Sequence, residues 1–281
     1  MILQETFRFI PYQVADSATN MALDEAILDA HLSGMVPPTL RLYGFSPPAV
    51  SLGYNQSLPS TVLNRIRAHG FDFVKRPSGG RAVLHLNDLT YCFVCSTASA
   101  THVPMYALVS DKVTQAYREI CLGLIYTFEE FGVHLKIGRA MGSYRNLEDC
   151  FQATTTADLH YKGRKIVGSA QMRRQHALMQ HGSIMVDQPL EAMQELLNER
   201  PINGNSVEKP GLGHANLVEI VGKETSIEAF ENAFKSGFGR AFSQKFVESP
   251  LSDFEINRAK ELRQKYRKAS MECALYPHLT K

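Results

Sequence analysis

The chain has 281 residues, of which 44% are hydrophobic and 21% charged, a composition typical of a soluble globular protein with a closed core. Its formal net charge of +2 provides no global basic field, which argues against a nucleic-acid-binding protein. No apolar run approaches the ~20 residues that a membrane-spanning helix needs, and the N-terminus lacks the pattern of a signal peptide.

The five cysteines are odd in number and widely spaced, unlike the disulfide framework of a small secreted domain. We therefore expect a cytoplasmic protein, because a reducing compartment keeps such thiols free. The cysteines are Cys92, Cys95, Cys121, Cys150 and Cys273.

Hydrophobic periodicity and turn residues divide the first half of the chain into short strands and helices. Asp16 or Ser17 can cap the first helix, and Gly34 can end it. The longest helix carries an apolar stripe that includes Cys121, which we assign to the core. The expected helices span residues 16–33, 60–69 and 109–131, and the expected strands span 40–45, 49–52, 72–75 and 90–96.

Cys92 and Cys95 have the C-x-x-C spacing of many metal and redox sites. They lie within the strand-like run 90–96, where positions three apart point to opposite faces. This geometry argues against a shared metal or redox role, and we expect both thiols to pack in the core.

Residues 76–81, with the sequence RPSGGR, lie between strand-like segments. Adjacent glycines allow the backbone to approach a ligand closely or to adopt a positive φ, although a tight turn is the commoner explanation. The segment lacks the Gly-Lys-Ser/Thr ending of a phosphate-binding loop and the spacing of a dinucleotide-binding fingerprint.

The second half of the chain continues with an irregular segment, a hairpin and a series of helices. The hairpin turns at Lys162-Gly163. The expected order is an irregular segment over 133–149, the hairpin over 158–170, a strand over 177–186, a helix over 187–199, a mobile loop or lid over 201–216, and two helices that begin with the capping boxes Thr225-x-x-Glu228 and Ser252-x-x-Glu255.

Strands grouped in hairpins and runs, with helices between the groups, favour an α+β fold over regular βαβ alternation. We expect antiparallel or mixed sheets flanked by helices. The length fits a single catalytic domain over residues 1–281, with a core over about 5–200 and a short helical C-terminal extension over about 217–281.

Cys150 is the candidate nucleophile. It lies in a predicted loop, where catalytic residues concentrate, although a single cysteine is more often a small buried hydrophobe. Basic residues on both sides would lower the pKa of its thiol and favour the thiolate. These residues are Arg139, Arg145, Lys162, Arg164, Lys165, Arg173 and Arg174.

Lys165 directly precedes the apolar and small-residue run 166–170. A lysine at the rim of such a strand can be partly desolvated, which lowers its pKa. It could then deprotonate an incoming amine or hold an acyl carbonyl oxygen by hydrogen bonding. The alternative is a solvated lysine on an exposed face.

His85 and His181 each lie beside a glycine-containing motif. A catalytic Cys-His pair and two hydrogen-bonded structural histidines both remain open for them. No His/Cys cluster has the spacing of metal ligands, so we expect no metal site.

Taken together, four motifs resemble those of the biotin/lipoate protein ligase and transferase superfamily, over roughly residues 5–190. A Gly-Gly-Arg followed by Val-Leu-His, with a cysteine before the Asp-Leu strand, looks like the branch of octanoyl-acyl-carrier-protein:protein N-octanoyltransferases of lipoate assembly. The motifs are NMALDE (20–25), KRPSGGRAVLH (75–85), GRKIVGSAQ (163–171) and QHGS (180–183).

The resemblance implies a biotin/lipoate ligase-like catalytic domain with Cys150 as nucleophile and Lys165 beside it. Cys150 would take octanoyl from acyl carrier protein and pass it to a lysine of a lipoyl domain or glycine-cleavage H protein. Exchange between thioesters is nearly balanced and amide formation is downhill, so neither ATP nor another cofactor is expected. The implied substrate-binding residues are Arg76, Ser78, Gly79, Gly80, Leu84, His85, Gly168, Ser169, Ala170, His181 and Gly182.

The local basic residues would dock the acidic carrier protein, and we expect no nucleic-acid or membrane partner and a monomer. The chain departs from the family at Lys75, where many relatives have arginine, and in a short loop over 140–148.

Three alternative functions remain. They are an ATP-dependent lipoate or octanoate ligase, which would not need Cys150, an amidotransferase that moves octanoyl between lipoyl proteins, and a non-catalytic binding protein.

Overall fold

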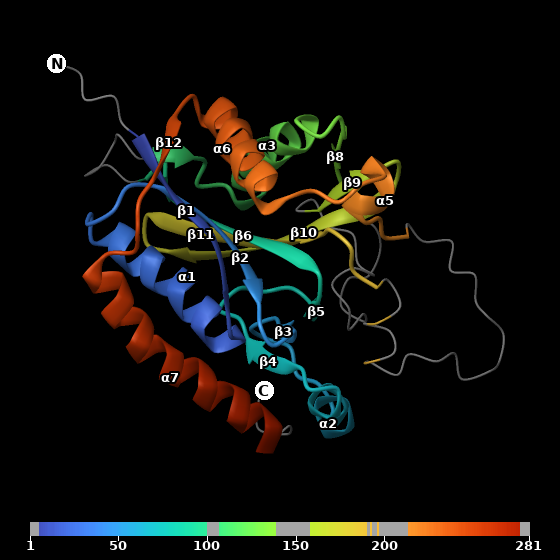
Figure 1. The fold of residues 1–281 in the computed structure, drawn as a ribbon. Coiled ribbons are helices and arrows are strands. Elements are labelled where there is room, and N and C mark those ends of the chain that lie inside the picture. Colours follow the sequence, from blue (N-terminus) through green and yellow to red (C-terminus); the bar gives the residue numbers. More distant parts are fainter. Residues whose placement is uncertain are drawn as a thin grey trace.

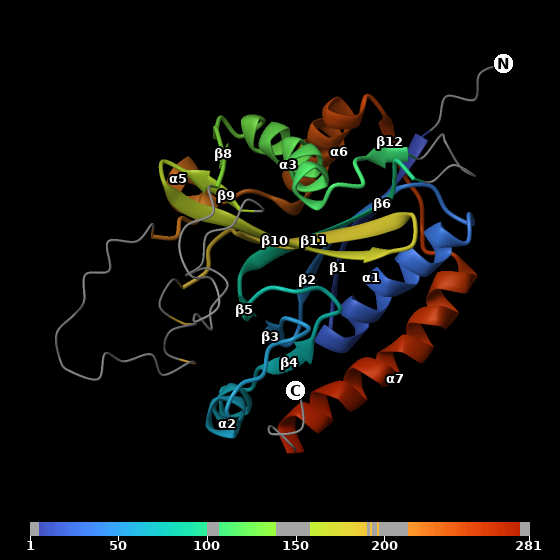
Figure 2. The same ribbon diagram turned by 180° about the vertical axis from the view of Figure 1, so that it is seen from behind.

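The computed structural model describes residues 6–99, 107–138, 158–189, 192, 196 and 213–275. Within these ranges the chain forms a large mixed sheet, a small three-stranded sheet, and helices on both faces of the large sheet (Figures 1 and 2). The predicted α+β class, with mixed sheets flanked by helices, is confirmed.

Most of the predicted elements that lie in the described residues are present within a few residues of the expected bounds. The helices are α1 (Ser17–Leu32), α2 (Ser60–Ala68), α3 (Val113–Glu129), α5 (Leu217–Val221), α6 (Ile227–Phe242) and α7 (Asp253–Leu275). The strands are β1 (Thr6–Ala15), β2 (Thr39–Phe45), β3 (Ala49–Leu52), β4 (Asp72–Lys75), β5 (Val83–His85), β6 (Asp88–Thr97), β7 (Ala107–Val109), β8 (Lys136–Ile137), β9 (Leu159–Tyr161), β10 (Arg164–Arg174), β11 (Ala177–Met185) and β12 (Lys245–Glu248).

Three sequence-based expectations differ from the structure. The helix expected from residue 109 begins at Val113, because residues 107–109 pair with β6 as strand β7. The segment expected to be irregular includes β8, which pairs with β9. The strand β1 and the edge strand β12 were not predicted at all, and they pair with each other in parallel.

The large sheet has the strand order β12-β1-β2-β6-β11-β10-β9-β8, with β7 also paired to β6. β1 runs parallel to β2 and β12, whereas neighbours from β2 to β8 are antiparallel. The β10–β11 register places Ser169 opposite Gly182 and Ala170 opposite His181. Two motifs separated in the sequence therefore lie side by side at the centre of the sheet.

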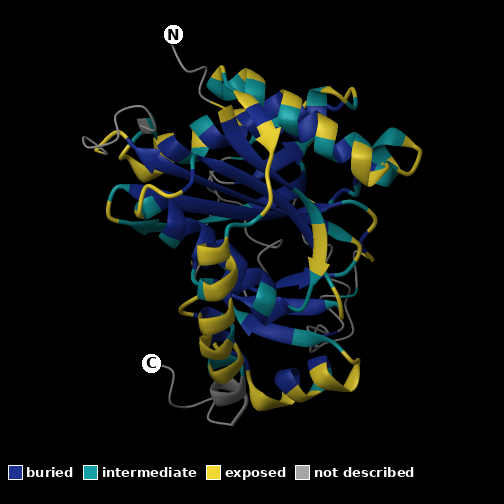
Figure 3. Cartoon of the chain, turned by 60° about the vertical axis from the view of Figure 1, so that its left-hand side comes forward, coloured by how far each residue is buried: buried dark blue, intermediate teal, exposed yellow. Residues whose placement is uncertain are grey.

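Side-chain alternation along β6 separates two hydrophobic cores. Tyr91, Phe93 and Cys95 belong to the core beneath α3 and α6, and Cys92 and Val94 belong to the core beneath α1. The prediction that the two C-x-x-C cysteines point to opposite faces is confirmed. Figure 3 shows the central strands of the large sheet buried between these layers, with α7 exposed on its outer side.

The predicted C-terminal extension packs into the main fold. Phe93 on β6 contacts Phe238 and Phe242 of α6, with ring centroids 5.2 and 5.1 Å apart. Arg8 on β1 forms a buried ion pair with Glu255 at the start of α7. Aromatic packing and ion pairing therefore join residues 217–275 to the same sheet.

One of the two predicted capping boxes is confirmed. Ser252 donates its backbone N–H to Glu255 Oε2 at 2.7 Å, and Glu255 donates its own to Ser252 Oγ at 3.3 Å. The prediction of a capping box at Thr225 is wrong. Helix α6 begins at Ile227, and its N-cap is Ser226, whose side chain accepts a hydrogen bond from the backbone N–H of Ala229.

The small sheet sits against one face of the large sheet (Figure 1). Residues 76–81, called the Gly-Gly segment below, lie in the connection between its strands β4 and β5. The sheet has the order β4-β3-β5, with β3 parallel to β4 and antiparallel to β5. Val50, Leu63, Ile66 and Leu84 form a separate hydrophobic core that joins it to α2. This second layer forms the wall opposite the central strands.

Gly237 permits the close packing of α3 and α6. A β-carbon there would lie 2.4 Å from the backbone nitrogen of Thr127 and 2.7 Å from the carbonyl oxygen of Gly123. We expect Gly237→Ala to lower the unfolding free energy by about 1–3 kcal/mol, because overpacking outweighs the ~1 kcal/mol helix propensity of alanine. Chemical denaturation measures the change.

The matched control is Asn232→Ala, on the exposed side of the same helix. It should change the unfolding free energy by no more than about 0.5 kcal/mol. A Gly237→Ala protein as stable as the wild type would contradict this account of the helix packing.

Candidate active site

A cavity lies between the small sheet and the central strands β6, β10 and β11, with an empty volume of about 510 Å³ that includes its open mouth. Met21 and Tyr43 line it together with most of the predicted substrate-binding residues. Those predicted residues are Arg76, Gly80, His85, Gly168, Ser169, Ala170, His181 and Gly182.

Ser78, Gly79 and Leu84 were also predicted to bind substrate, and they do not line this cavity. Leu84 alternates with Val83 and His85 along β5, so its side chain points away from the cavity into the core around α2. Ser78 and Gly79 lie behind the wall and hold it by hydrogen bonds.

Arg76 fixes the shape of the Gly-Gly segment. Its guanidinium donates to the carbonyl oxygens of Ser51 and Gly79, each at 2.9 Å, and of Arg81 at 2.7 Å. Gly80 has a φ of 98°. The opposing backbone is so close that a β-carbon on Gly53 would lie 1.9 Å from the Gly80 carbonyl oxygen. Gly53 therefore permits a close backbone contact, and Gly80 provides a positive φ.

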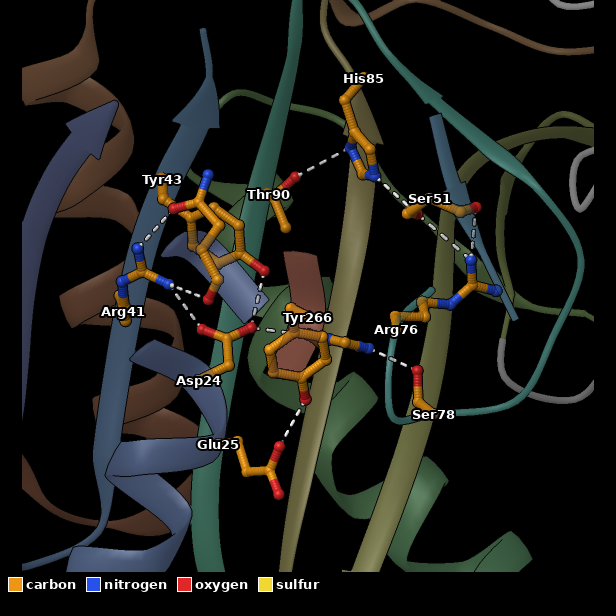
Figure 4. A network of polar contacts seen from close by, with 12 residues as sticks. Asp24, Glu25, Arg41, Tyr43, Ser51, Arg76, Ser78, His85, Thr90 and Tyr266 are labelled. Carbon is orange, nitrogen blue, oxygen red and sulfur yellow. Dashed lines mark hydrogen bonds and ion pairs between the residues drawn. The ribbon is translucent and has the colours of Figure 1, made fainter. Parts of the chain in front are cut away.

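His181 connects the Gly-Gly segment to a buried carboxylate. Its Nε2 lies 2.5 Å from Ser78 Oγ, and its Nδ1 lies 3.2 Å from Asp24 Oδ2. Asp24 also accepts from Arg41 at 2.6 Å and from Tyr43 at 2.7 Å (Figure 4). Because an ionised carboxylate only accepts, a neutral His181 carries its hydrogen on Nδ1 and accepts the Ser78 hydroxyl at Nε2.

His85 repeats this arrangement on the small sheet. Its Nε2 lies 2.9 Å from Ser51 Oγ and its Nδ1 lies 2.8 Å from Asp88 Oδ2. Its ring stacks on Phe45, with 3.9 Å between centroids. Asp88 Oδ2 also accepts from Ser183 Oγ at 2.6 Å. Both histidines are thus hydrogen-bonded at both ring nitrogens, as the structural interpretation of the sequence expected.

Gly182 leaves room for the groups of β10 and β6 that pack against it. A β-carbon there would lie 2.6 Å from the Gly168 carbonyl oxygen and 2.8 Å from Ser169 Oγ. Polar side chains of the lining donate hydrogen bonds to neighbouring protein atoms. Tyr43 donates to the carboxylate of Asp24, and His85 and Ser183 are hydrogen-bonded to that of Asp88. Such a wall can face an apolar chain without leaving donors unsatisfied.

Lys165 lies at the start of β10 and is more deeply buried than the predicted rim position, with only 1% of its side chain exposed. Its Nζ lies 2.9 Å from Oδ1 of Asp158, which is itself 2% exposed and lines the cavity. The predicted desolvation of Lys165 is therefore accompanied by a carboxylate that the sequence did not reveal as a site residue.

Cys150, Arg139 and Arg145 lie outside the described residues, and the role of Cys150 stays a prediction. Two other basic residues that were expected to surround it form ion pairs of their own. Arg164 binds Glu219 at 2.5 Å, and Arg174 binds Glu25 at 2.8 Å.

Three cysteines are described, and all are buried. Burial raises the pKa of the Cys121 thiol to about 12, and it also raises the pKa of Cys92 and Cys95. These side chains remain protonated thiols near neutral pH, which agrees with their predicted place in the core.

Within the described ranges, no three His, Cys, Asp or Glu side chains gather into a group that could hold a metal ion. A search of the same ranges found no helix with the length and apolar character needed to cross a membrane.

The family model of the lipoyl protein ligase A/B catalytic domain matches residues 16–239. An octanoyltransferase LipM from Halalkalibacterium halodurans is 34% identical over 276 residues, covering 92% of this chain and 95% of that protein. A LipM from Symbiobacterium thermophilum is 36% identical over 254 residues, covering 86% of this chain and 89% of that protein.

Two solved structures share the fold. Lipoate-protein ligase A bound with ATP gives a TM-score of 0.74 at 22% identity, covering 96% of this chain and 100% of that one. A bipartite lipoate protein ligase from Thermoplasma acidophilum gives 0.67 at 20% identity, covering 97% of both chains.

Asp24 provides a test of the buried network. We expect Asp24→Asn to lower the unfolding free energy at pH 7 by about 3–5 kcal/mol, because Arg41 stays charged and buried without its carboxylate. Burial raises the pKa of Asp24, but the hydrogen bond from His181 and the positive charge of Arg41 outweigh burial and lower it. This stabilisation is therefore present above about pH 4 and is lost as the pH falls through the lowered pKa.

Urea denaturation at pH 7 and at acidic pH measures both effects, since the asparagine variant should lack this acid-dependent loss. Glu261→Gln, which removes an exposed partner of Arg258, is the control and should cost less than about 1 kcal/mol. Wild-type stability of Asp24→Asn at pH 7 would disprove the anchoring role.

Proposed function

Because the chain belongs to the lipoyl protein ligase A/B catalytic domain family, we propose that it is an octanoyltransferase of lipoate biosynthesis that carries the acyl group on Cys150. The observation that carries this proposal is the similarity, over nearly the full length of both chains, to curated octanoyltransferases. The ATP-bound structural neighbour contributes only the shared fold.

The first step exchanges one thioester for another. The Cys150 thiolate attacks the carbonyl carbon of octanoyl on acyl carrier protein, a carbon–sulfur bond forms, and the carrier thiolate leaves and takes a proton from solvent. In the second step the neutral amine of an acceptor lysine attacks the same carbon. The bond to Cys150 breaks, and the amine proton passes to the Cys150 sulfur, so no ATP is consumed.

The cavity supports this reaction as the site of the octanoyl chain. Its walls include Gly80 on one side and Gly168 and Ser169 on the other, and Asp158, which also lines it, forms an ion pair with Lys165. Its polar side chains are hydrogen-bonded within the protein, which suits an apolar chain. The three described cysteines are buried thiols with raised pKa, so they do not compete with Cys150 as nucleophiles.

The proposed donor is octanoyl-acyl carrier protein, and the proposed acceptor is a lipoyl domain or glycine-cleavage H protein. We further propose that the enzyme works as a monomer in the cytoplasm.

An ATP-dependent lipoate ligase is the second candidate, because its fold spans nearly this whole chain. In that enzyme Lys165 would contact an acyl-adenylate and Cys150 would be dispensable.

Intact-mass measurement after mixing the protein with octanoyl-acyl carrier protein, without ATP, tests the proposal. We expect a single octanoyl adduct that hydroxylamine removes, because the acyl group is held as a thioester. Cys150→Ser should form no such thioester and should lose nearly all transfer to a lipoyl domain.

Cys92→Ser is the matched control, since this buried thiol lies in the core beneath α1. It should still form the adduct in the fraction that folds. Substantial transfer by Cys150→Ser would disprove the nucleophile. No adduct with the carrier protein, together with transfer from octanoate and ATP, would instead identify a ligase.

A further inference from the structure

We propose that Asp158 is a positioning residue that holds Lys165 as a buried ammonium, so that Lys165 acts as a hydrogen-bond donor to the reacting carbonyl oxygen and not as a base. This inference rests on the proposed octanoyl transfer through Cys150 and deepens it. It decides between the two roles that the sequence left open for Lys165.

The ion pair is the first observation. Lys165 Nζ and Asp158 Oδ1 lie 2.9 Å apart, and the two side chains are 1% and 2% exposed. Burial alone disfavours an ammonium, whereas an adjacent carboxylate favours it. Neither ion would be stable here without the other, so the pair is held as carboxylate and ammonium.

The backbones of both residues are fixed as well. Lys165 donates its N–H to the Gly213 carbonyl at 3.0 Å, and its carbonyl accepts from Ala215 at 2.9 Å. The Asp158 carbonyl accepts from the N–H of Gly138 at 2.8 Å. The ion pair is therefore held by a fixed backbone beside the cavity that Asp158 lines, and electrostatic catalysis requires such preorganisation.

Among the described residues around the pair, Asp158 is the carboxylate that an ion-pair contact places against the ammonium, and the other buried titratable groups are of different kinds. His160 lies opposite Lys165 on β9, and burial holds its pKa below its usual value. Cys121 approaches from α3 as a thiol whose pKa burial raises, and His214 pairs with Lys165 through the backbone. The Arg164–Glu219 pair follows on the exposed side, where solvent screens it.

This charge state suits the chemistry of both transfer steps. Attack on a thioester places negative charge on the carbonyl oxygen, and a preorganised ammonium in a water-poor site stabilises that charge. The proton released by the acceptor amine ends on the Cys150 sulfur, so the reaction balances without a base at Lys165. A base there would first have to give up the proton that Asp158 stabilises.

The isolated octanoyl-enzyme gives the sharpest test, because its Cys150 no longer titrates. Single-turnover transfer to methoxyamine is followed by intact mass across pH, since this weakly basic amine stays unprotonated throughout. The rate of a free octanoyl thioester is subtracted. We expect the wild-type rate to be flat through neutral pH and to fall only at alkaline pH, where Lys165 loses its proton.

In Asp158→Asn the ammonium loses the carboxylate that lies 2.9 Å away, while it stays buried. We expect the alkaline fall to move at least one pH unit lower and the rate at pH 8 to drop at least tenfold. A base would behave in the opposite way, with a rate that rises with pH and a rise that moves to lower pH in Asp158→Asn. That result, or a profile identical to the wild type, would overturn the proposal.

Glu219→Gln is the matched control, because it removes an exposed carboxylate that pairs with the residue next to Lys165. Its profile should coincide with the wild type. Lys165→Arg covers the case in which Asp158→Asn does not fold, since arginine stays protonated and cannot act as a base. Measurable transfer without an alkaline fall supports the proposal, and complete loss of transfer in a folded Lys165→Arg protein refutes it.

The protonation state is also read directly by NMR of ¹⁵Nζ-labelled lysine, without any acyl donor. We expect Lys165 to remain an ammonium through neutral pH in the wild type and to titrate at a lower pH in Asp158→Asn. A neutral Lys165 at pH 7 in the wild type would refute the ion pair. This readout stands even if no octanoyl-enzyme forms, which would instead refute the proposed function.

Discussion

The Asp24 carboxylate ties together four parts of the chain that the sequence keeps far apart. It extends from α1, accepts hydrogen bonds from Arg41 and Tyr43 on β2, and lies against His181 on β11. Through His181 it reaches Ser78 in the Gly-Gly segment of the small sheet. Since all of these groups are buried, losing the carboxylate would leave a charge and several donors without compensation. The cavity depends on this network because its two walls meet there.

The same rule of compensation applies at two other buried cations. Arg8 is paired with Glu255, which anchors α7 to the edge of the sheet, and Lys165 is paired with Asp158 beside the cavity. Each buried pair is costly to desolvate and more costly to break, so its geometry is strongly specified. At Arg8 the specification serves the fold. At Lys165 it fixes a positive charge next to Asp158, a residue that lines the cavity.

Local patterns predicted much of this fold, and long-range pairing explains what they missed. The strand over 90–96 and the Lys162-Gly163 turn followed from alternation and turn chemistry. β1 and β12 pair across more than two hundred residues, which no local window detects. Likewise, the resemblance to the ligase and transferase superfamily identified most of the cavity wall, whereas the contact of Asp158 with Lys165 arises only when folding brings the two together. A charged residue on the buried face of the first helix was the available signal for Asp24.

The shared fold of ligases and transferases has a physical explanation in this site. An ammonium held at the edge of an acyl cavity stabilises negative charge on a carbonyl oxygen, whichever group leaves that carbon. The cavity, the Gly-Gly wall and the Lys165–Asp158 pair are therefore independent of the acyl donor. What separates the two chemistries is the attacking group, a thiolate that must be reached by a carrier-bound thioester or an acid that must first be activated. In the proposed mechanism, a change at Cys150 alone would alter the route of the acyl group without rebuilding the cavity wall that holds it.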